Sequence, residues 1–493
     1  MTAMEDCRVL LQQRLVQRLG LVVFLTVVGA LSFSYKLTLL DPDTWWHLKV
    51  GDWIIEHTAV PHTGILSRTA ANRPWVAYSW GYELLLSRAY AWFGLAGIGV
   101  FGALLTIGVA YGVYWMMRRL SGRFWLAVVG ASIVSSAFLF DGSPRPFFVS
   151  IALYGVMLAL LLEANRSGRV PVLYWLPLIF LVWANIHVQF IYGLFVLGLF
   201  VGVNVMQRLL GAAGIAPGFL QFPSLPAAHL LGIFAACVLA TLIGPNFYHP
   251  YIAVYQYTQA KFPYSVIVEL QPLSFRLYSN LAELLLAAAG FYAVGWQKKI
   301  EPFKLALLAV AAVVAFRTMR DAWFICLSAA ACVADFPATD SQRDPVPTWL
   351  GGAGVAAVTA VLLLAISSST DFNQRGLDRT ISATYPVNAI NFLRRNPVPG
   401  PLYNNLNWGG FLMWYMPDTP VAIDGRNDLY GDDLDRMFYD TQNAAKSYET
   451  DPYLNEAGVI LLDSTLPLAK ILTVDPRFRL IYRDQIATVY ARR

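Results

Sequence analysis

The sequence GLVVFLTVVGALSFSYKLTLL at residues 20–40 is followed directly by Asp41-Pro42-Asp43-Thr44-Trp45-Trp46-His47-Leu48. The apolar run is long enough to cross a bilayer. The string after it holds two carboxylates and a histidine, with paired tryptophans between them. Titratable groups are costly at a membrane boundary and usually mark a functional site. The sequence therefore predicts a spanning helix with a site at its end.

The composition places the whole chain among integral membrane proteins. Of its 493 residues 57% are hydrophobic and only 14% are charged, and the mean hydropathy is +0.51, outside the range of soluble domains. Short basic loops explain the net charge of +5, and no basic tract predicts a nucleic-acid partner. The four cysteines share no metal-ligand spacing with histidines, so neither a metal cluster nor a disulfide framework is expected from them.

Hydropathy predicts about eleven membrane-spanning stretches, so the fold class is a polytopic α-helical membrane protein. The stretches lie near Gly20–Leu40, Leu95–Met117, Phe124–Phe140, Phe147–Glu163, Val172–Asn185, Val188–Leu209, Leu230–Gly244, Leu281–Trp296, Phe303–Phe316, Ala322–Ala334 and Trp349–Ser367. No small-residue cleavage site closes a short apolar core, so we expect the first helix to be retained.

Lysines and arginines gather in alternate loops, and cytoplasmic loops carry this excess. The residues concerned are Arg8, Arg14, Arg18, Arg118, Arg119, Arg123, Arg166, Arg169, Arg208, Lys298, Lys299 and Lys304. This pattern predicts a cytoplasmic N-terminus and, for an odd number of spans, a polar C-terminal region outside the cytoplasm.

The remaining loops, predicted to be on the outer side, collect titratable side chains. These are Asp41, Asp43, His47, Asp141, Arg145, His187, His249, Glu269, Arg317, Arg320 and Asp321. Lysines and arginines are otherwise concentrated in the cytoplasmic loops. Arginines on the outer side therefore indicate a local function, such as binding an anionic phosphate. Two of these outer segments are long, residues 41–80 and 245–278. We expect two short helices in the first and a re-entrant or surface-lying piece in the second.

The chain divides by composition into a transmembrane domain, residues 1–370, and an extracytoplasmic α/β domain, residues 371–493. Alternating patterns in the second domain favour an open sheet packed with helices. Strands are predicted at 401–404, 421–424 and 457–463, and a hairpin over 478–490. The Asp424-Gly425-Arg426 turn ends one of these strands, either as part of a site or as a structural turn.

Three strings are similar to those of uncharacterised bacterial members of the GT-C superfamily of membrane glycosyltransferases. They are Asp41-x-Asp43-x-x-Trp46-His47-Leu48-x-x-Gly51, Trp183-Ala184-Asn185-Ile186-His187 and Val421-x-Ile423-Asp424-Gly425-Arg426. The long first outer loop, the outer arginines and the C-terminal outer domain resemble the same superfamily. The chain lacks the W-W-D-Y-G string of oligosaccharyltransferases and the Asp-Glu pair of protein mannosyltransferases, so neither activity is expected literally.

The resemblance implies a location in the bacterial cytoplasmic (inner) membrane and a glycan-building activity of the cell envelope. The donor would be a sugar on a polyprenyl phosphate or diphosphate, and the acceptor a glycan, lipid or protein outside the cytoplasm. The reaction would be an inverting displacement in which Asp41 or Asp43 deprotonates the acceptor hydroxyl. The pair could instead hold a divalent metal, Mg or Mn, together with phosphate oxygens.

The leaving phosphate needs cations or hydrogen-bond donors around it. Arg320 and Arg317 are the first candidates and Arg145 is the next, each with an ordinary ion pair as its alternative. His187 joins them as a phosphate-binding candidate, and His47, His249 and Glu269 are secondary candidates.

Two other classes of function stay open. A transporter of polyprenyl lipids or polysaccharide would use the outer charges to bind a headgroup, but internal repeats and polar groups near the bilayer midplane, typical of transporters, are not seen. A catalytically inactive GT-C relative would use its outer domain for binding.

Overall fold

The computed structural model describes residues 3–34, 36–139, 143–215, 218–220, 225–336, 360, 374–445 and 448–493. The chain forms two compact units. Unit 1 consists of Met1–Tyr35, Gly102–Phe247 and Val268–Thr370, and unit 2 consists of Lys36–Phe101, Tyr248–Ile267 and Asp371–Arg493.

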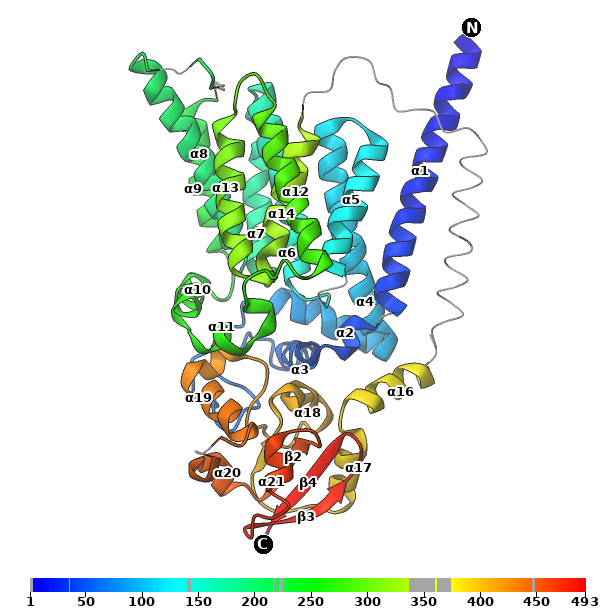
Figure 1. The fold of residues 1–493 in the computed structure, drawn as a ribbon, viewed down its shortest axis with the longest axis vertical. Helices are drawn as coiled ribbons and strands as arrows, with labels where there is room; N and C mark the ends of the chain where they lie inside the picture. The colour runs from blue at the N-terminus through cyan, green and yellow to red at the C-terminus, as the bar shows by residue number, and fades with distance from the viewer. Residues whose placement is uncertain are drawn as a thin grey trace. The chain divides into compact units, whose positions relative to one another are not determined.

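Unit 1 is helical, and most of its helices run alongside one another as a bundle (Figure 1). Its helices are α1 (Ala3–Ser34), the C-terminal part of α4 (Trp80–Ser121), α5 (Phe124–Leu139), α6 (Phe147–Ser167), α7 (Leu176–Ile186), α8 (Phe190–Ala212), α9 (Ala227–Thr241), α12 (Tyr278–Gly295), α13 (Pro302–Arg317) and α14 (Ala322–Ala334). Short 3₁₀ turns join them at η1 (Pro171–Trp175), η2 (Val268–Leu270) and η3 (Met319–Asp321).

Small residues allow the helices of unit 1 to approach closely. A Cβ built on Gly290 of α12 would lie 2.8 Å from the Cβ of Ala329 in α14, and one on Gly112 would lie 3.3 Å from the Cα of Ala152. Close backbone approach through small residues is the usual packing of helices in membranes, where dispersion contacts and not the hydrophobic effect hold helices together.

Each predicted spanning stretch from Gly20 to Ala334 coincides with a helix. Within the described ranges, four helices are long and apolar enough to cross a membrane: Arg14–Leu40, Trp80–Ser121, Phe147–Ser167 and Phe190–Ala212. Several others are apolar but shorter, so the count of about eleven crossings stays a prediction. The stretch Trp349–Ser367 lies outside the described residues. The chain is a helical membrane protein with a small C-terminal sheet.

Unit 2 is a mixed α/β assembly. Its helices are α2 (Leu37–Leu40), α3 (Pro42–His57), the start of α4, α10 (His249–Gln259), α11 (Phe262–Val266), α16 (Gln374–Thr384), α17 (Val387–Arg395), α18 (Gly409–Tyr415), α19 (Asn427–Gln442), α20 (Pro452–Glu456) and α21 (Pro467–Ile471). Strands β1 (Leu402–Asn404), β2 (Val459–Asp463), β3 (Phe478–Arg483) and β4 (Ala487–Arg492) form one sheet in the order β1-β2-β4-β3. The β1–β2 pair is parallel, and β4 is antiparallel to both of its neighbours.

Helix α3, from the predicted first outer loop, belongs to the core of unit 2. Trp45 is fully buried, and its ring lies 5.6 Å from Tyr385, 5.0 Å from Phe411 and 5.0 Å from Trp414. Aromatic pairs of this kind contribute about 0.5–1.5 kcal/mol each beyond their burial. The residues that come after Asp41 therefore pack with the C-terminal α/β elements. The predicted division between residues 370 and 371 falls outside the described residues and stays a prediction.

The first outer loop differs from the expected pair of helices. It contains the single helix α3, which ends at His57 and is followed by Thr58 with a left-handed backbone (φ 50°), and residues 58–79 continue without a helix. The predicted strand at 421–424 is also wrong. Val421 pairs with this loop instead of joining the sheet, since Arg68 N donates to Val421 O (2.8 Å) and Val421 N donates to Leu66 O (3.1 Å).

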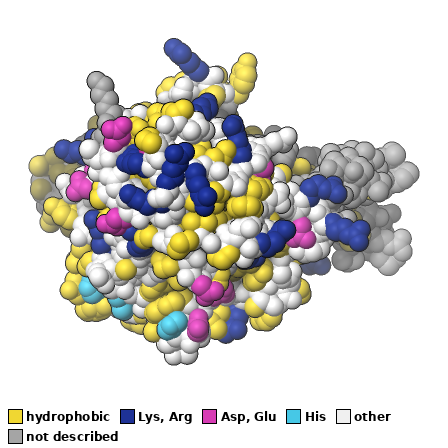
Figure 2. All heavy atoms as spheres, turned by 90° about the horizontal axis from the view of Figure 1, so that it is seen from below, with side chains coloured by type: hydrophobic (Ala, Val, Ile, Leu, Met, Phe, Trp, Pro, Cys, Tyr) yellow, Lys and Arg dark blue, Asp and Glu magenta, His cyan; other side chains and the backbone are white. Residues whose placement is uncertain are grey.

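Charge in unit 2 is divided between elements. Viewed from the end where the C-terminus lies in Figure 1, lysine and arginine side chains gather among apolar ones (Figure 2). Exposed arginines of the sheet and of α17 are Arg394, Arg395, Arg479, Arg483, Arg492 and Arg493. Helix α19, in contrast, is acidic along its first two turns and beyond, with the sequence NDLYGDDLD.

Candidate active site

The acidic motif of unit 2 begins helix α3. Asp41, which is 4% exposed, is the N-cap: its Oδ1 accepts a hydrogen bond from Asp43 N at 3.0 Å, and Pro42 occupies the first helical turn. Asx caps and an N-terminal proline are the standard signals for a helix start. Asp43 is half-buried, and its Oδ1 accepts a hydrogen bond from Trp46 Nε1 at 3.1 Å. The structure thus gives the two carboxylates different surroundings.

The predicted secondary residue His47 faces a buried carboxylate that the sequence did not single out. Its Nδ1 lies 3.1 Å from Glu83 Oε1, and both side chains are almost fully buried. Helix α3 also touches α4 at Gly51, where a Cβ would lie 2.1 Å from Glu83 O. A histidine–carboxylate contact at a glycine crossing fastens the two helices together.

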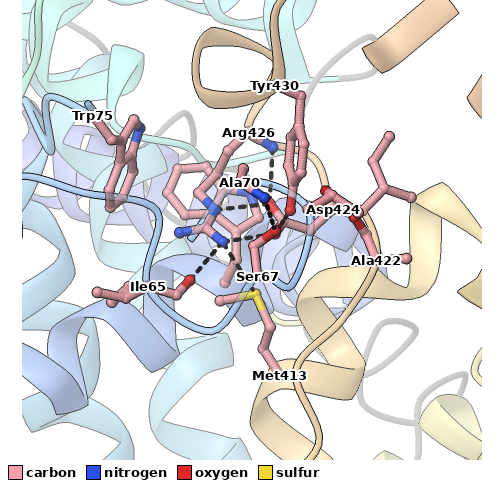
Figure 3. A network of polar contacts seen from close by, with 12 residues as sticks. Ile65, Ser67, Ala70, Trp75, Met413, Ala422, Asp424, Arg426 and Tyr430 are labelled. Carbon is pink, nitrogen blue, oxygen red and sulfur yellow. Dashed lines mark hydrogen bonds and ion pairs between the residues drawn. The ribbon is translucent and has the colours of Figure 1, made fainter. Parts of the chain in front are cut away.

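The motif at Asp424 and Arg426 forms a buried ion pair in unit 2 (Figure 3). Arg426 Nε donates to Asp424 Oδ1 at 2.8 Å, and Arg426 Nη2 donates to Asp424 Oδ2 at 2.7 Å and to Ile65 O at 3.0 Å. Tyr430 Oη donates to the same carboxylate at 2.7 Å, and the ring of Trp75 lies 4.9 Å from the guanidinium carbon. The pair therefore ties the first outer loop to the start of α19.

Electrostatics keep this pair charged. Burial lowers the pKa of Arg426, but the facing Asp424 carboxylate outweighs burial, so the net pKa lies above the ordinary value. Removing one partner of a buried pair leaves an uncompensated charge and costs about 3–5 kcal/mol. The sequence indicates a turn at Asp424-Gly425-Arg426, but no local pattern shows that the side chains of Asp424 and Arg426 are buried.

In unit 1, two predicted phosphate-binding arginines share one carboxylate. Arg145 Nη1 lies 3.3 Å from Glu269 Oε1, and Arg320 Nη2 contacts the same oxygen. The three side chains come from the residues before α6, from η2 and from η3, and each is 24–40% exposed. The group carries one net positive charge and is open to solvent, so an anion can compete with Glu269 for the arginines.

A buried acid lies directly beside Arg320 in sequence. Asp321 accepts hydrogen bonds from Thr318 Oγ1 at 2.8 Å, from Tyr192 Oη at 2.9 Å and from Gln189 Nε2 at 3.4 Å. Burial raises the pKa of Asp321, and the hydrogen bonds from Thr318 and Tyr192 moderate the rise. These contacts fix η3, and with it the backbone that carries Arg320.

His187, just beyond the end of α7, is held by α6. Its Nδ1 lies 2.9 Å from Ser150 Oγ, which also accepts a hydrogen bond from Trp183 Nε1 at 2.7 Å. Burial and the positive charge of Arg320 lower the pKa of His187 to about 3. The imidazole is therefore neutral at physiological pH and can act as a hydrogen-bonding group but not as a cation.

Two other predicted residues are exposed. Arg317, at the end of α13, makes no ion pair or hydrogen bond with the residues that the structure describes. His249, at the start of α10 in unit 2, stacks on Tyr248 with ring centroids 4.5 Å apart. Asp141, another of the outer-side titratable residues, lies outside the described residues. Among the described acids, Glu269 forms an ion pair with Arg145.

The described residues contain no group of three or more His, Cys, Asp or Glu side chains arranged to hold a metal ion. A metal at Asp41 and Asp43 would need further ligands beyond the described side chains, from water or from a substrate. Because the described side chains alone do not build the site, the mechanism proposed for the protein contains no metal-dependent step.

Comparison with solved structures identifies the fold. The chain is similar to the oligosaccharyltransferase of Archaeoglobus fulgidus tethered with an acceptor peptide, with a TM-score of 0.54 and 12% identity, covering 98% of this chain and 74% of that one. The same organism's AglB, in complex with an inhibitory peptide and a dolichol-phosphate, gives a TM-score of 0.50 at 13% identity, covering 90% and 69%. ArnT from Cupriavidus metallidurans bound to undecaprenyl phosphate aligns over 96% and 98% at 14% identity, but its TM-score of 0.43 is too low to bear on the assignment.

The protein therefore has the fold of the archaeal oligosaccharyltransferase, which agrees with the membrane-glycosyltransferase fold that the resemblance of its sequence motifs implied. No protein-family model matches the sequence. A search of curated proteins likewise finds no match.

Proposed function

We propose that the protein is a GT-C glycosyltransferase that moves a sugar from a polyprenyl-phosphate-linked donor to an acceptor outside the cytoplasm. The observation that carries the proposal is the convergence of Arg145 and Arg320 on Glu269. Two guanidinium groups that share one exposed carboxylate form a site that a phosphate can enter. The archaeal neighbour of the same fold was solved with a dolichol-phosphate, which supports a polyprenyl phosphate as the ligand.

The displacement would begin at the acceptor. A carboxylate takes the proton of an acceptor hydroxyl, the acceptor oxygen forms a bond to the anomeric carbon, and the bond from that carbon to the phosphate oxygen breaks with inversion. The electron pair leaves on the phosphate, where Arg145 and Arg320 stabilise it. In this proposal the neutral imidazole of His187 forms a hydrogen bond with the leaving phosphate.

Asp43 is the carboxylate that we assign as the base. Asp41 is almost fully buried and caps α3, whereas Asp43 is half-buried. That the base and the arginines serve one reaction is inferred from the predicted topology, which puts both on outer loops. The bacterial inner membrane, the cytoplasmic N-terminus and the outer location of unit 2 belong to the same proposal.

The phosphate site can be tested by binding, without knowledge of the sugar. In nanodiscs, undecaprenyl phosphate should bind the wild-type protein, and Arg145→Ala and Arg320→Ala should each weaken binding about tenfold, the loss expected for one charge-assisted contact. Arg317→Ala is the matched control. Arg317 lies three residues from Arg320 but forms no ion pair with Glu269 in the part of the chain that the structure describes, so the proposal gives it no part in the phosphate site and its loss should leave affinity within twofold. Equal losses in all three variants, or none, would reject the assignment.

A further inference from the structure

Two motifs from opposite ends of the sequence lie against each other in unit 2. A Cβ built on Gly425 would lie 2.2 Å from Asp43 Oδ1 and 3.3 Å from Trp46 Nε1. Real Cβ atoms essentially never approach another atom closer than 3.0 Å. Gly425 does not have a positive φ, so the position requires glycine for close approach and not for backbone freedom.

The oxygen that meets Gly425 also accepts a side-chain hydrogen bond. Asp43 Oδ1 accepts the hydrogen bond from Trp46 Nε1 at 3.1 Å, and Trp46 is only 8% exposed. The same oxygen therefore contacts both an indole N–H and the peptide backbone at Gly425, and the two contacts restrict rotation of the carboxylate. The side chain that we assign as the base is thus oriented by two neighbours, one local and one distant in sequence.

The turn that carries Gly425 is itself rigid. Arg426 N donates to Asp424 Oδ1 at 3.0 Å, and Asn427 N donates to Gly425 O at 3.0 Å. Asp424 and Arg426, the residues before and after Gly425 in the sequence, form a buried ion pair with each other (Figure 3). Ile423, just before the turn, packs closely against α18: a Cβ built on Gly409 would lie 2.0 Å from Ile423 O.

We propose that the Asp424-Gly425-Arg426 turn is a positioning element for the Asp43 carboxylate, with Gly425 as the contact and the buried ion pair as its support. The inference rests on the proposed function, since it gives the turn a role in orienting the base. A small displacement of a reacting group lowers the reaction rate about a hundredfold. Holding the Asp43 carboxylate in a fixed position therefore increases the rate, in addition to any effect on stability.

The test compares Gly425→Ala with Gly232→Ala in the full-length protein, assayed for consumption of a polyprenyl-phosphate-linked sugar. Gly232 lies in α9, and a Cβ there would meet nothing within 4 Å, so it controls for the chemical change alone. Gly425→Ala should lower kcat about 10–100-fold with the donor KM within twofold, and Gly232→Ala should change neither. A wild-type kcat in folded Gly425→Ala would overturn the inference and leave the proposed function standing.

A second variant covers the case in which Gly425→Ala does not fold. Trp46→Phe removes the indole N–H that donates to the Asp43 carboxylate, together with part of the ring, and adds no atoms. A carboxylate that loses a donor is easier to protonate, so the acidic limb of the kcat–pH profile should move to higher pH. An unmoved limb would contradict the positioning role.

Thermal stability distinguishes failure of this inference from failure of the proposed function. Gly425→Ala should lower the apparent Tm, and this loss should shrink by more than half in an Asp43→Ala background, where the added methyl group has room. Additive Tm changes would refute the contact whether or not the protein is active. A wild-type protein that consumes no donor would reject the proposed function, while the Tm comparison still decides whether Gly425 holds Asp43.

Discussion

Glu269 is the residue whose change separates a phosphate site from a structural ion pair. In unit 1 its Oε1 contacts both Arg145 and Arg320. If a phosphate displaces the carboxylate, Glu269 competes with the ligand. Glu269→Gln should therefore bind undecaprenyl phosphate about 3–10-fold more tightly than the wild type, as expected when about 1 kcal/mol of competition is removed. Weaker binding by Glu269→Gln would show instead that the carboxylate organises the arginines for the ligand.

The two aspartates of α3 offer a comparison within one motif. Asparagine caps a helix as well as aspartate does, so Asp41→Asn should keep the apparent Tm and at least a third of the wild-type turnover. Asp43→Asn cannot accept a proton and should lower kcat at least about a hundredfold, the usual contribution of a general base. Both rates are measured with one donor at saturation. A larger loss in Asp41→Asn than in Asp43→Asn would reverse the assignment.

At the scale of elements, helix α19 carries a buried acid without a hydrogen-bond partner. Asp435 is 2% exposed, and neither of its carboxylate oxygens bonds to a described residue. Burial, together with the charges of Asp424, Asp428 and Asp432, raises its pKa to about 8, and only Arg73 opposes the rise. The helix kinks at Gly431 (φ 71°) within this acidic run.

The raised pKa makes stability depend on pH in a defined direction. Unfolded Asp435 loses its proton near pH 4, whereas the folded group keeps it to about pH 8. Its contribution is therefore fully present below pH 4 and is lost as the pH rises toward 8. Asp435→Asn should raise the apparent Tm at pH 8, and the gain should diminish toward pH 5. A Tm difference between variant and wild type that is constant over pH 5–8 would contradict this account.

At the scale of the whole molecule, the sequence predicted those elements whose signals lie within a short stretch of chain. Apolar runs predicted the helices of unit 1, because that signal is local. The strand predicted at Val421 failed because its backbone pairs with the first outer loop, a partner that no local pattern specifies. The contact between Gly425 and Asp43 is of the same kind, since it depends on how distant segments pack.

The same distinction between local signals and long-range packing applies to the candidate residues. The charge of Arg145 and Arg320 on predicted outer loops indicates a phosphate site, and in the structure both side chains contact Glu269. The loop pattern predicts Lys304 to be one of the basic loop residues that orient the chain. It is buried between Glu301 (2.8 Å) and Asp335 (2.7 Å), so its charge is neutralised inside unit 1. Residue type predicts a charge, but only packing shows which charges are already paired.

Donor turnover by the full-length protein in nanodiscs tests the central claim most directly. The wild type is incubated with a panel of polyprenyl-phosphate-linked and diphosphate-linked sugars and a cell-envelope fraction as the acceptor source, and released polyprenyl phosphate is measured by mass spectrometry. We expect release from at least one donor by the wild type and by Arg317→Ala, and about a hundredfold slower release by Asp43→Asn. No release from any donor by the wild type, or undiminished release by Asp43→Asn, would contradict the account.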